Sequence, residues 1–200
     1  MCLIDHKNKI IFIAVTKCAS TSIKSFLNTE LKKDSNNINS FNIQNQDRTE
    51  IQKHSTAEEI SSLIENYSEY TSIAVIRNPF DWYVSWYTYR MRKGSVYQTS
   101  NMTFKEYLEK QPMEELISFI SDKNNNIIVD HIIRYEENIE EQFKKILTNI
   151  VSFPIEINIP KINISKKRAH KDYRKYYDDE TRELVEKLQS VTLKKFGYKF

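Results

Sequence analysis

The stretch from Lys9 to Leu27, KIIFIAVTKCASTSIKSFL, constrains the fold of this chain more than any other. It opens with Ile10–Val15, an unbroken apolar run rich in β-branched residues, which is typical of a strand buried on both faces. Small, hydroxylated or basic residues follow at Thr16–Ser22, and apolar residues then recur at helical spacing from Ile23. The stretch therefore predicts a strand, a tight polar turn and a helix that begins at about Ser20.

A helix N-terminus directly after a buried strand can bind an anion. The first backbone amides of a helix have no partner within the helix, and the helix dipole is positive there. Lys17, Ser20, Thr21 and Ser22 add side-chain donors to those amides. A Walker A loop has glycines and places its lysine at the helix start, whereas this loop has no glycine and its lysine comes early. Cys18 is expected to serve as a small side chain in the turn, with a nucleophile as the alternative.

A second buried strand is predicted at Ser72–Ile76, and it runs into the segment RNPFDWYVS. Asn78 can cap the following helix, and Pro79 can occupy its first position. Ser85 comes eight residues after Arg77, two turns into that helix. A guanidinium binds phosphate through two parallel hydrogen bonds, and a hydroxyl adds one more donor. Taken alone, Arg77 is equally well explained as a surface ion-pair partner.

Strands alternate with helices along the rest of the chain. A third strand-like run lies at Ile127–Tyr135. Further helices are predicted after a capping box at Ser55–Glu58, after Thr103, and at Met113–Ile120, Glu136–Leu147 and Asp179–Lys195. This order indicates an α/β fold with a short central parallel sheet flanked by helices. At 200 residues and 40% hydrophobic composition, the chain is expected to form one domain over residues 1–200.

Charge and cysteine content restrict the class of protein. The net charge of +3 is too small to indicate nucleic-acid binding by itself. Cys2 and Cys18 are too few for a disulfide framework and indicate a reducing compartment. A membrane-spanning helix needs about 20 apolar residues, and every apolar run of this sequence is shorter. The N-terminus lacks the apolar core of a signal peptide. We therefore expect a cytoplasmic protein.

Thr16–Ser22 resembles the 5′-phosphosulfate loop of the sulfotransferase family, Pro-Lys-x-Gly-Thr-Thr-Ser, with Thr16 for the Pro, Ala19 for the Gly and Ser20 for the first Thr. The segment from Arg77 resembles that family's 3′-phosphate signature, Arg-Asp-Pro followed by a Ser at the same spacing, with Asn78 in place of the Asp. The resemblance implies a P-loop-like, three-layer α/β fold. It also implies transfer of a sulfuryl group from 3′-phosphoadenosine 5′-phosphosulfate (PAPS) to a hydroxyl, leaving 3′-phosphoadenosine 5′-phosphate (PAP).

The resemblance also implies which residues hold the donor. Those expected at the 5′-phosphosulfate are Lys17, Cys18, Ala19, Ser20, Thr21 and Ser22, and those expected at the 3′-phosphate are Arg77 and Ser85. In the family, a loop near the C-terminus closes over the nucleotide. The basic run Lys161–Lys175 is the counterpart here, and Lys166, Lys167 or Arg168 is expected to contact the nucleotide. No metal is required, because Lys17 and the backbone amides can stabilise the departing phosphate.

A hydroxyl acceptor benefits from a general base. Carbohydrate sulfotransferases often use a His or Glu from the segment between the two phosphate motifs, and His54 lies there, directly before the capping box. His54 is the expected base, with a helix-capping or surface role as the alternative, and Glu58 and Glu59 follow as candidates. The C-terminal segment from Asp172 resembles the carbohydrate-type branch of the family, which implies a sugar acceptor.

Two other functions remain open. Ile127–Asp130 imitates a Walker B strand ending in a magnesium-binding Asp, which would suit a small-molecule kinase. Trp82, Trp86 and the basic run Lys161–Lys175 could form an RNA-binding surface, although aromatic residues at helical spacing are more typical of a core.

Overall fold

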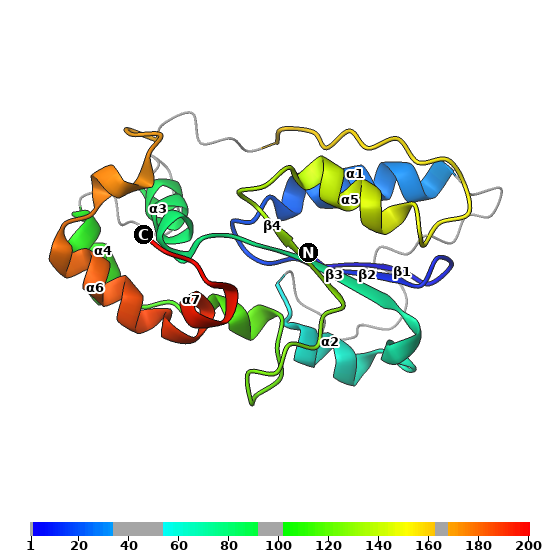
Figure 1. Ribbon diagram of the computed structural model, residues 1–200, viewed down its shortest axis with the longest axis horizontal. Coiled ribbons are helices and arrows are strands. Elements are labelled where there is room, and N and C mark those ends of the chain that lie inside the picture. Colours follow the sequence, from blue (N-terminus) through cyan, green and yellow to red (C-terminus); the bar gives the residue numbers. More distant parts are fainter. Residues whose placement is uncertain (1, 34–53, 92–101, 163–167) are drawn as a thin grey trace. The chain divides into compact units, whose positions relative to one another are not determined.

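The computed structural model describes residues 2–33, 54–91, 102–162 and 168–200 (Figure 1). The chain divides into two compact units. Unit 1 comprises Met1–Ile76 and Ser118–Asn163, and unit 2 comprises Arg77–Ile117 and Ile164–Phe200. The single domain expected over residues 1–200 stays a prediction.

Unit 1 is built on a four-stranded sheet in the order β1-β2-β3-β4. Its strands are β1 (Leu3–Asp5), β2 (Ile10–Ile13), β3 (Thr71–Ile76) and β4 (His131–Arg134). The pairs β2–β3 and β3–β4 are parallel, and β1 pairs antiparallel with β2. The predicted α/β fold with a short, mostly parallel sheet is thus confirmed. Sequence analysis missed β1, because a three-residue strand carries no readable period.

Helices cover both faces of this sheet, as Figure 1 shows. On one side lie α1 (Ser20–Lys33) and α5 (Ile139–Leu147), and on the other lies α2 (Ala57–Leu63). Phe143 of α5 contacts Phe12 of β2 and Phe26 of α1, with ring centroids 6.4 and 6.1 Å apart. Each such buried ring contributes about 1.5–3 kcal/mol of hydrophobic stabilisation. This packing explains why every residue of β2 is buried.

Several boundaries in unit 1 differ from the sequence predictions: β2 ends at Ile13 and not at Val15, and α5 begins at Ile139 and not at Glu136. The capping box of α2 uses Thr56 and Glu59, one residue later than predicted: Glu59 N donates to Thr56 Oγ1 (3.2 Å) and Thr56 N to a Glu59 carboxylate oxygen (2.8 Å). The strand predicted at Ile127–Tyr135 corresponds to β4, which begins only at His131. Ile127 and Ile128 pair instead with the segment at Ile120 and Ser121, so they do not extend β4.

Unit 2 is helical, with α3 (Pro79–Arg90), α4 (Phe104–Lys110), α6 (Asp179–Leu188) and α7 (Ser190–Phe196). Asn78 caps α3 by accepting a hydrogen bond from Phe80 N at 3.0 Å, and Pro79 occupies its first turn, as predicted. A capping box of Thr103 and Glu106 starts α4.

The single C-terminal helix predicted over Asp179–Lys195 is wrong, because Gln189 breaks it. Gln189 is fully buried, and its side-chain oxygen accepts a hydrogen bond from Leu116 N at 2.8 Å while its amide donates to Glu114 O at 3.1 Å. A buried side chain that satisfies two backbone groups outweighs the loss of helix continuity. The same contacts help to explain why a short 3₁₀ turn, Leu116–Phe119, replaces the helix predicted at Met113–Ile120.

Tyr107 of α4 offers a test of packing in unit 2. Burial raises its pKa to about 12 from the ordinary 10.0. The folded state then holds the phenol proton more tightly than the unfolded state. The free energy of unfolding is therefore insensitive to this group below pH 10 and falls by about 2–3 kcal/mol as pH rises from 10 to 12. Tyr107→Phe should remove that part of the alkaline loss.

Urea unfolding of the wild type and Tyr107→Phe across this pH interval measures the effect. Tyr89→Phe is the matched control, because the Tyr89 ring is exposed on α3. Equal alkaline losses in the wild type and Tyr107→Phe would contradict the assignment.

Candidate active site

The loop between β2 and α1 has a backbone suited to anions. Lys17 and Ala19 have positive φ values of 58° and 57°, while Cys18 between them does not. Alternation of φ sign turns successive backbone amides toward one side and forms a concave anion site. Ala19 occupies the position of the glycine in the pattern Pro-Lys-x-Gly-Thr-Thr-Ser. Its left-handed conformation explains why glycine is favoured at this position.

The start of α1 adds to this electrostatic environment. The helix begins at Ser20, as predicted, and the amide of Ile23 donates to Ala19 O at 3.0 Å. The helix amides that precede Ile23 have no acceptor within the helix. The first turn contains no acidic residue, so no side chain there offsets the positive end of the helix dipole.

The side chains of the loop divide into buried and accessible groups. Cys18 is buried, which agrees with a small side chain in the turn, whereas Lys17 and Ser20 are half-buried and Thr21 is exposed. The Ser22 hydroxyl accepts a hydrogen bond from Ile162 N at 3.1 Å and lies 3.4 Å from Ile162 O. Ser22 therefore anchors the extended segment before residue 163, and its backbone amide is the group that remains suited to an anion.

His54 is attached to the strand that leads into the loop. Its Nδ1 lies 2.9 Å from the carbonyl oxygen of Ala14, 40 positions away in sequence. Because a carbonyl only accepts, Nδ1 carries the proton of the neutral ring and Nε2 carries the lone pair. This tautomer is the one that a general base at Nε2 requires.

The two glutamates considered as alternative bases have structural partners. A Glu59 carboxylate oxygen closes the capping box of α2, and Glu58 Oε1 accepts a hydrogen bond from Lys123 N at 3.2 Å. Both side chains are exposed at the helix start. The assignment of the base to His54 stays a prediction, and these contacts give both glutamates a structural role.

Asp130 does not occupy a Walker B position. It precedes β4 instead of ending a strand, and its Oδ2 accepts hydrogen bonds from Ser72 Oγ (2.6 Å) and Ser72 N (2.8 Å) near the start of β3. The anion loop follows the carboxyl end of β2, and β2, β3 and β4 are parallel. Asp130 thus lies at the opposite edge of the sheet, which removes the basis of the kinase alternative. Trp82 is 2% exposed, so it offers no ring to RNA.

In unit 2, Arg77 follows the last residue of β3 along the chain, and its guanidinium binds Asp81. Arg77 Nε donates to Asp81 Oδ2 at 2.7 Å, and Nη2 donates to the same oxygen. Asp81 and Ser85 are four residues apart on α3, so they lie on one helix face. Ser85 is half-buried, and its hydroxyl makes no hydrogen bond to any described residue.

Arg168 reaches the same carboxylate. Its Nη2 lies 2.6 Å from Asp81 Oδ1, and its guanidinium carbon lies 5.9 Å from the centre of the Tyr176 ring. Lys166 and Lys167, the other expected nucleotide contacts, lie outside the described residues. Asp81 was not among the predicted site residues, although an acidic residue four positions after Arg77 at the start of a helix indicates a partner for that arginine.

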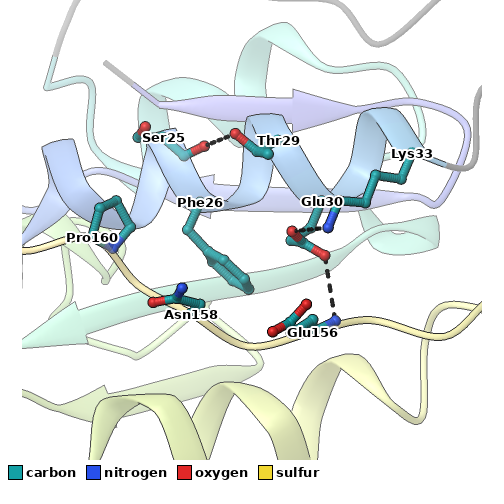
Figure 2. Close-up of a pocket in the computed structure, with 8 residues that line it drawn as sticks. All are labelled: Ser25, Phe26, Thr29, Glu30, Lys33, Glu156, Asn158 and Pro160. Atoms are coloured by element: carbon teal, nitrogen blue, oxygen red, sulfur yellow. Dashed lines mark hydrogen bonds and ion pairs between the residues drawn. The ribbon is translucent and has the colours of Figure 1, made fainter.

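The predicted loop residues do not line the cavity of about 260 Å³ along α1, shown in Figure 2. The buried Glu30 carboxylate binds Lys33 Nζ at 2.6 Å and accepts from Glu156 N at 3.3 Å. These contacts fix the extended segment containing Glu156 against α1.

Within the described ranges, no three His, Cys, Asp or Glu side chains are grouped so that they could hold a metal ion. In the same part of the chain, no helix combines the length and apolar composition needed to cross a membrane.

Comparison with known proteins identifies the family. The model of the Sulfotransferase family matches residues 1–199, almost the whole chain. The chain therefore belongs to the sulfotransferase family and is a PAPS-dependent transferase. Neither the search of curated proteins nor the search of solved structures returned a match. The family predicted from the two phosphate motifs is confirmed.

The strained backbone of the loop makes a measurable prediction. A left-handed conformation costs a residue with a Cβ about 1–2 kcal/mol, and glycine avoids this cost but loses more entropy on folding. Ala19→Gly should therefore raise the free energy of unfolding by about 0.5–1 kcal/mol.

Ala169→Gly is the matched control, because Ala169 is exposed and its φ is not positive. It should lower the free energy of unfolding by a few tenths of a kcal/mol. Urea denaturation measures the free energy of unfolding of both variants. If Ala19→Gly lowers it as Ala169→Gly does, the backbone is not strained at Ala19.

Proposed function

We propose that this protein transfers the sulfuryl group of PAPS to a hydroxyl of a carbohydrate in the cytoplasm. One observation carries the proposal: the loop with left-handed Lys17 and Ala19 follows the strand end whose Ala14 carbonyl oxygen orients the ring of His54. The carbohydrate acceptor rests on the resemblance of the C-terminal segment to the carbohydrate-type branch. The cytoplasmic assignment rests on two buried thiols, Cys2 and Cys18, in a chain without further cysteines.

The two phosphate-bearing ends of the donor are assigned to different residues. The 5′-phosphosulfate is assigned to the backbone amides of the loop and to the Lys17 ammonium. The 3′-phosphate is assigned to Arg77 and to the Ser85 hydroxyl, with Arg168 as a second guanidinium. Two observations support this fit: Arg168 Nε and Nη2 are buried without a hydrogen-bond acceptor among the described residues, and the Ser85 hydroxyl is available.

Catalysis then follows from charge and proton positions. The acceptor oxygen attacks sulfur in line, the bond from sulfur to the 5′-phosphate oxygen breaks, and PAP departs with the electron pair of that bond. His54 Nε2 takes the proton of the attacking hydroxyl. Negative charge grows on the departing oxygen, where Lys17 and the loop amides can stabilise it. This assignment needs no metal, because the protein itself supplies the positive charge.

Substitution of Lys17 and substitution of His54 should change turnover and donor binding in different ways. Lys17 acts most strongly where charge develops in the transition state, so Lys17→Ala should reduce turnover much more than it weakens donor binding. His54→Ala should leave PAP affinity unchanged and reduce turnover by roughly 10²–10⁴-fold. The wild-type rate should fall on acidification, as the imidazole takes up a proton and loses its lone pair. Turnover of labelled PAPS on a panel of glycans, with PAP calorimetry, measures both.

His131→Ala is the matched control, because His131 is exposed at the opposite edge of the sheet. It should keep wild-type turnover and pH dependence. Near-normal turnover of His54→Ala with an unchanged pH profile would show that His54 is not the base, and transfer to small alcohols but to no glycan would reject the carbohydrate acceptor.

A further inference from the structure

We propose that Asp81 is a built-in counterion that occupies the phosphate-binding arginines in the absence of donor, and that it determines which anions can bind there. The proposal rests on the proposed function for the identity of the ligand, the 3′-phosphate of the donor. It concerns residues of unit 2 alone.

The geometry places one carboxylate between two guanidinium groups. Asp81 Oδ2 accepts from Arg77 Nε at 2.7 Å and from Arg77 Nη2, while Oδ1 lies 2.6 Å from Arg168 Nη2. A phosphate held by Arg77 and Arg168 needs the Arg77 donors that this carboxylate uses and lies against the same Arg168 charge. Asp81 therefore stands in for the phosphate.

The contact with Arg168 is an ion pair without hydrogen-bond geometry. Arg168 Nε and Nη2 and Asp81 Oδ1 are buried, yet none has a hydrogen-bond partner among the described residues. Buried guanidinium donors without an acceptor are costly, and charged acceptors satisfy them best. A tetrahedral phosphate offers more acceptor oxygens than a carboxylate does, so Arg168 is better satisfied by the ligand than by Asp81.

Burial makes the charge balance decisive. The side chains of Arg77, Asp81 and Arg168 are 9%, 15% and 15% exposed, and the ring of Tyr176 lies against Arg168. Two arginines of like charge in such surroundings require a counterion, and Asp81 supplies it. With Asp81 present the cluster carries one net positive charge, because two guanidinium charges face one carboxylate.

This balance discriminates among anions. A singly charged anion offers the two arginines no more negative charge than Asp81 does. Asp81 also loses less entropy on binding them, because it is already attached to the chain. A terminal phosphate carries about −1.5 to −2 charges at pH 7 and can displace it. Asp81 is thus a specificity-determining residue that favours a terminal 3′-phosphate over weaker anions.

Asp81→Asn tests the proposal, because it removes the charge and keeps the size of the side chain. PAP should bind roughly 10- to 100-fold more tightly than to the wild type, the equivalent of one charge-assisted hydrogen bond. Inorganic phosphate should raise the melting temperature of this variant at lower concentration than it does for the wild type. A residue that merely supports the fold would give weaker binding, so a gain is diagnostic.

Asp179→Asn is the matched control: it removes the same charge from unit 2 at a side chain that is 93% exposed, and it should leave PAP affinity unchanged. Asp81→Glu keeps the charge and should bind PAP no more tightly than the wild type. If Asp81→Asn does not fold, Asp81→Ser is measured in its place, and it should likewise bind PAP more tightly than the wild type.

The outcomes separate this inference from the proposed function. Equal or weaker PAP binding by Asp81→Asn, with a wild type that binds PAP, overturns the counterion role and leaves the proposed function intact. A wild type that does not bind PAP overturns the proposed function. The phosphate measurement then still decides the counterion role, which fails if Asp81→Asn gains no stabilisation over the wild type.

Discussion

The burial of β2 on both faces is the constraint on which the anion loop depends. Its residues are buried, with β1 and β3 as hydrogen-bonded neighbours and the ring of Phe143 packed against both Phe12 and Phe26. A strand so enclosed gives a fixed starting point to the backbone that follows. The left-handed residues of the loop are tolerated because packing on both sides determines where the chain must turn. His54 is attached to the same strand end through Ala14 O, so His54 and the loop share one support.

The two groups of residues to which we assign the phosphates of the donor carry positive charge by different means. The loop before α1 uses backbone amides and a helix dipole, whose partial charges are fixed and need no counterion. Arg77 and Arg168 carry full guanidinium charges, which burial would make unfavourable without Asp81. Accordingly, an acidic residue lies beside Arg77, and none lies in the first turn of α1.

Much of the central architecture could be predicted from local sequence patterns. The strand before Thr16, the helix start at Ser20 and the cap at Asn78 were predictable, because apolar periodicity and capping chemistry act over a few residues. The capping box at α2 was placed one residue early, since Ser55 with Glu58 and Thr56 with Glu59 fit the same pattern.

Other features depend on contacts that are distant in sequence. Helical periodicity continues through Gln189, and the break depends on its hydrogen bonds with Leu116 N and Glu114 O, 73 and 75 positions away. The attachment of His54 to Ala14 and the engagement of Ser22 by Ile162 likewise span 40 and 140 positions. The sequence indicated which residue types could bind phosphate, but the occupation of Arg77 by Asp81 required the geometry of α3.

The central claim is that the chain recognises its donor through the 3′-phosphate, with Arg77 as the main contact. Calorimetry with PAP and adenosine 5′-phosphate, which differ only in that group, tests it most directly. The account predicts that the wild type prefers PAP by roughly 10- to 100-fold, the value of a charge-assisted pair. It also predicts that Arg77→Ala loses most of this preference. Equal affinity of the wild type for the two nucleotides would contradict the account.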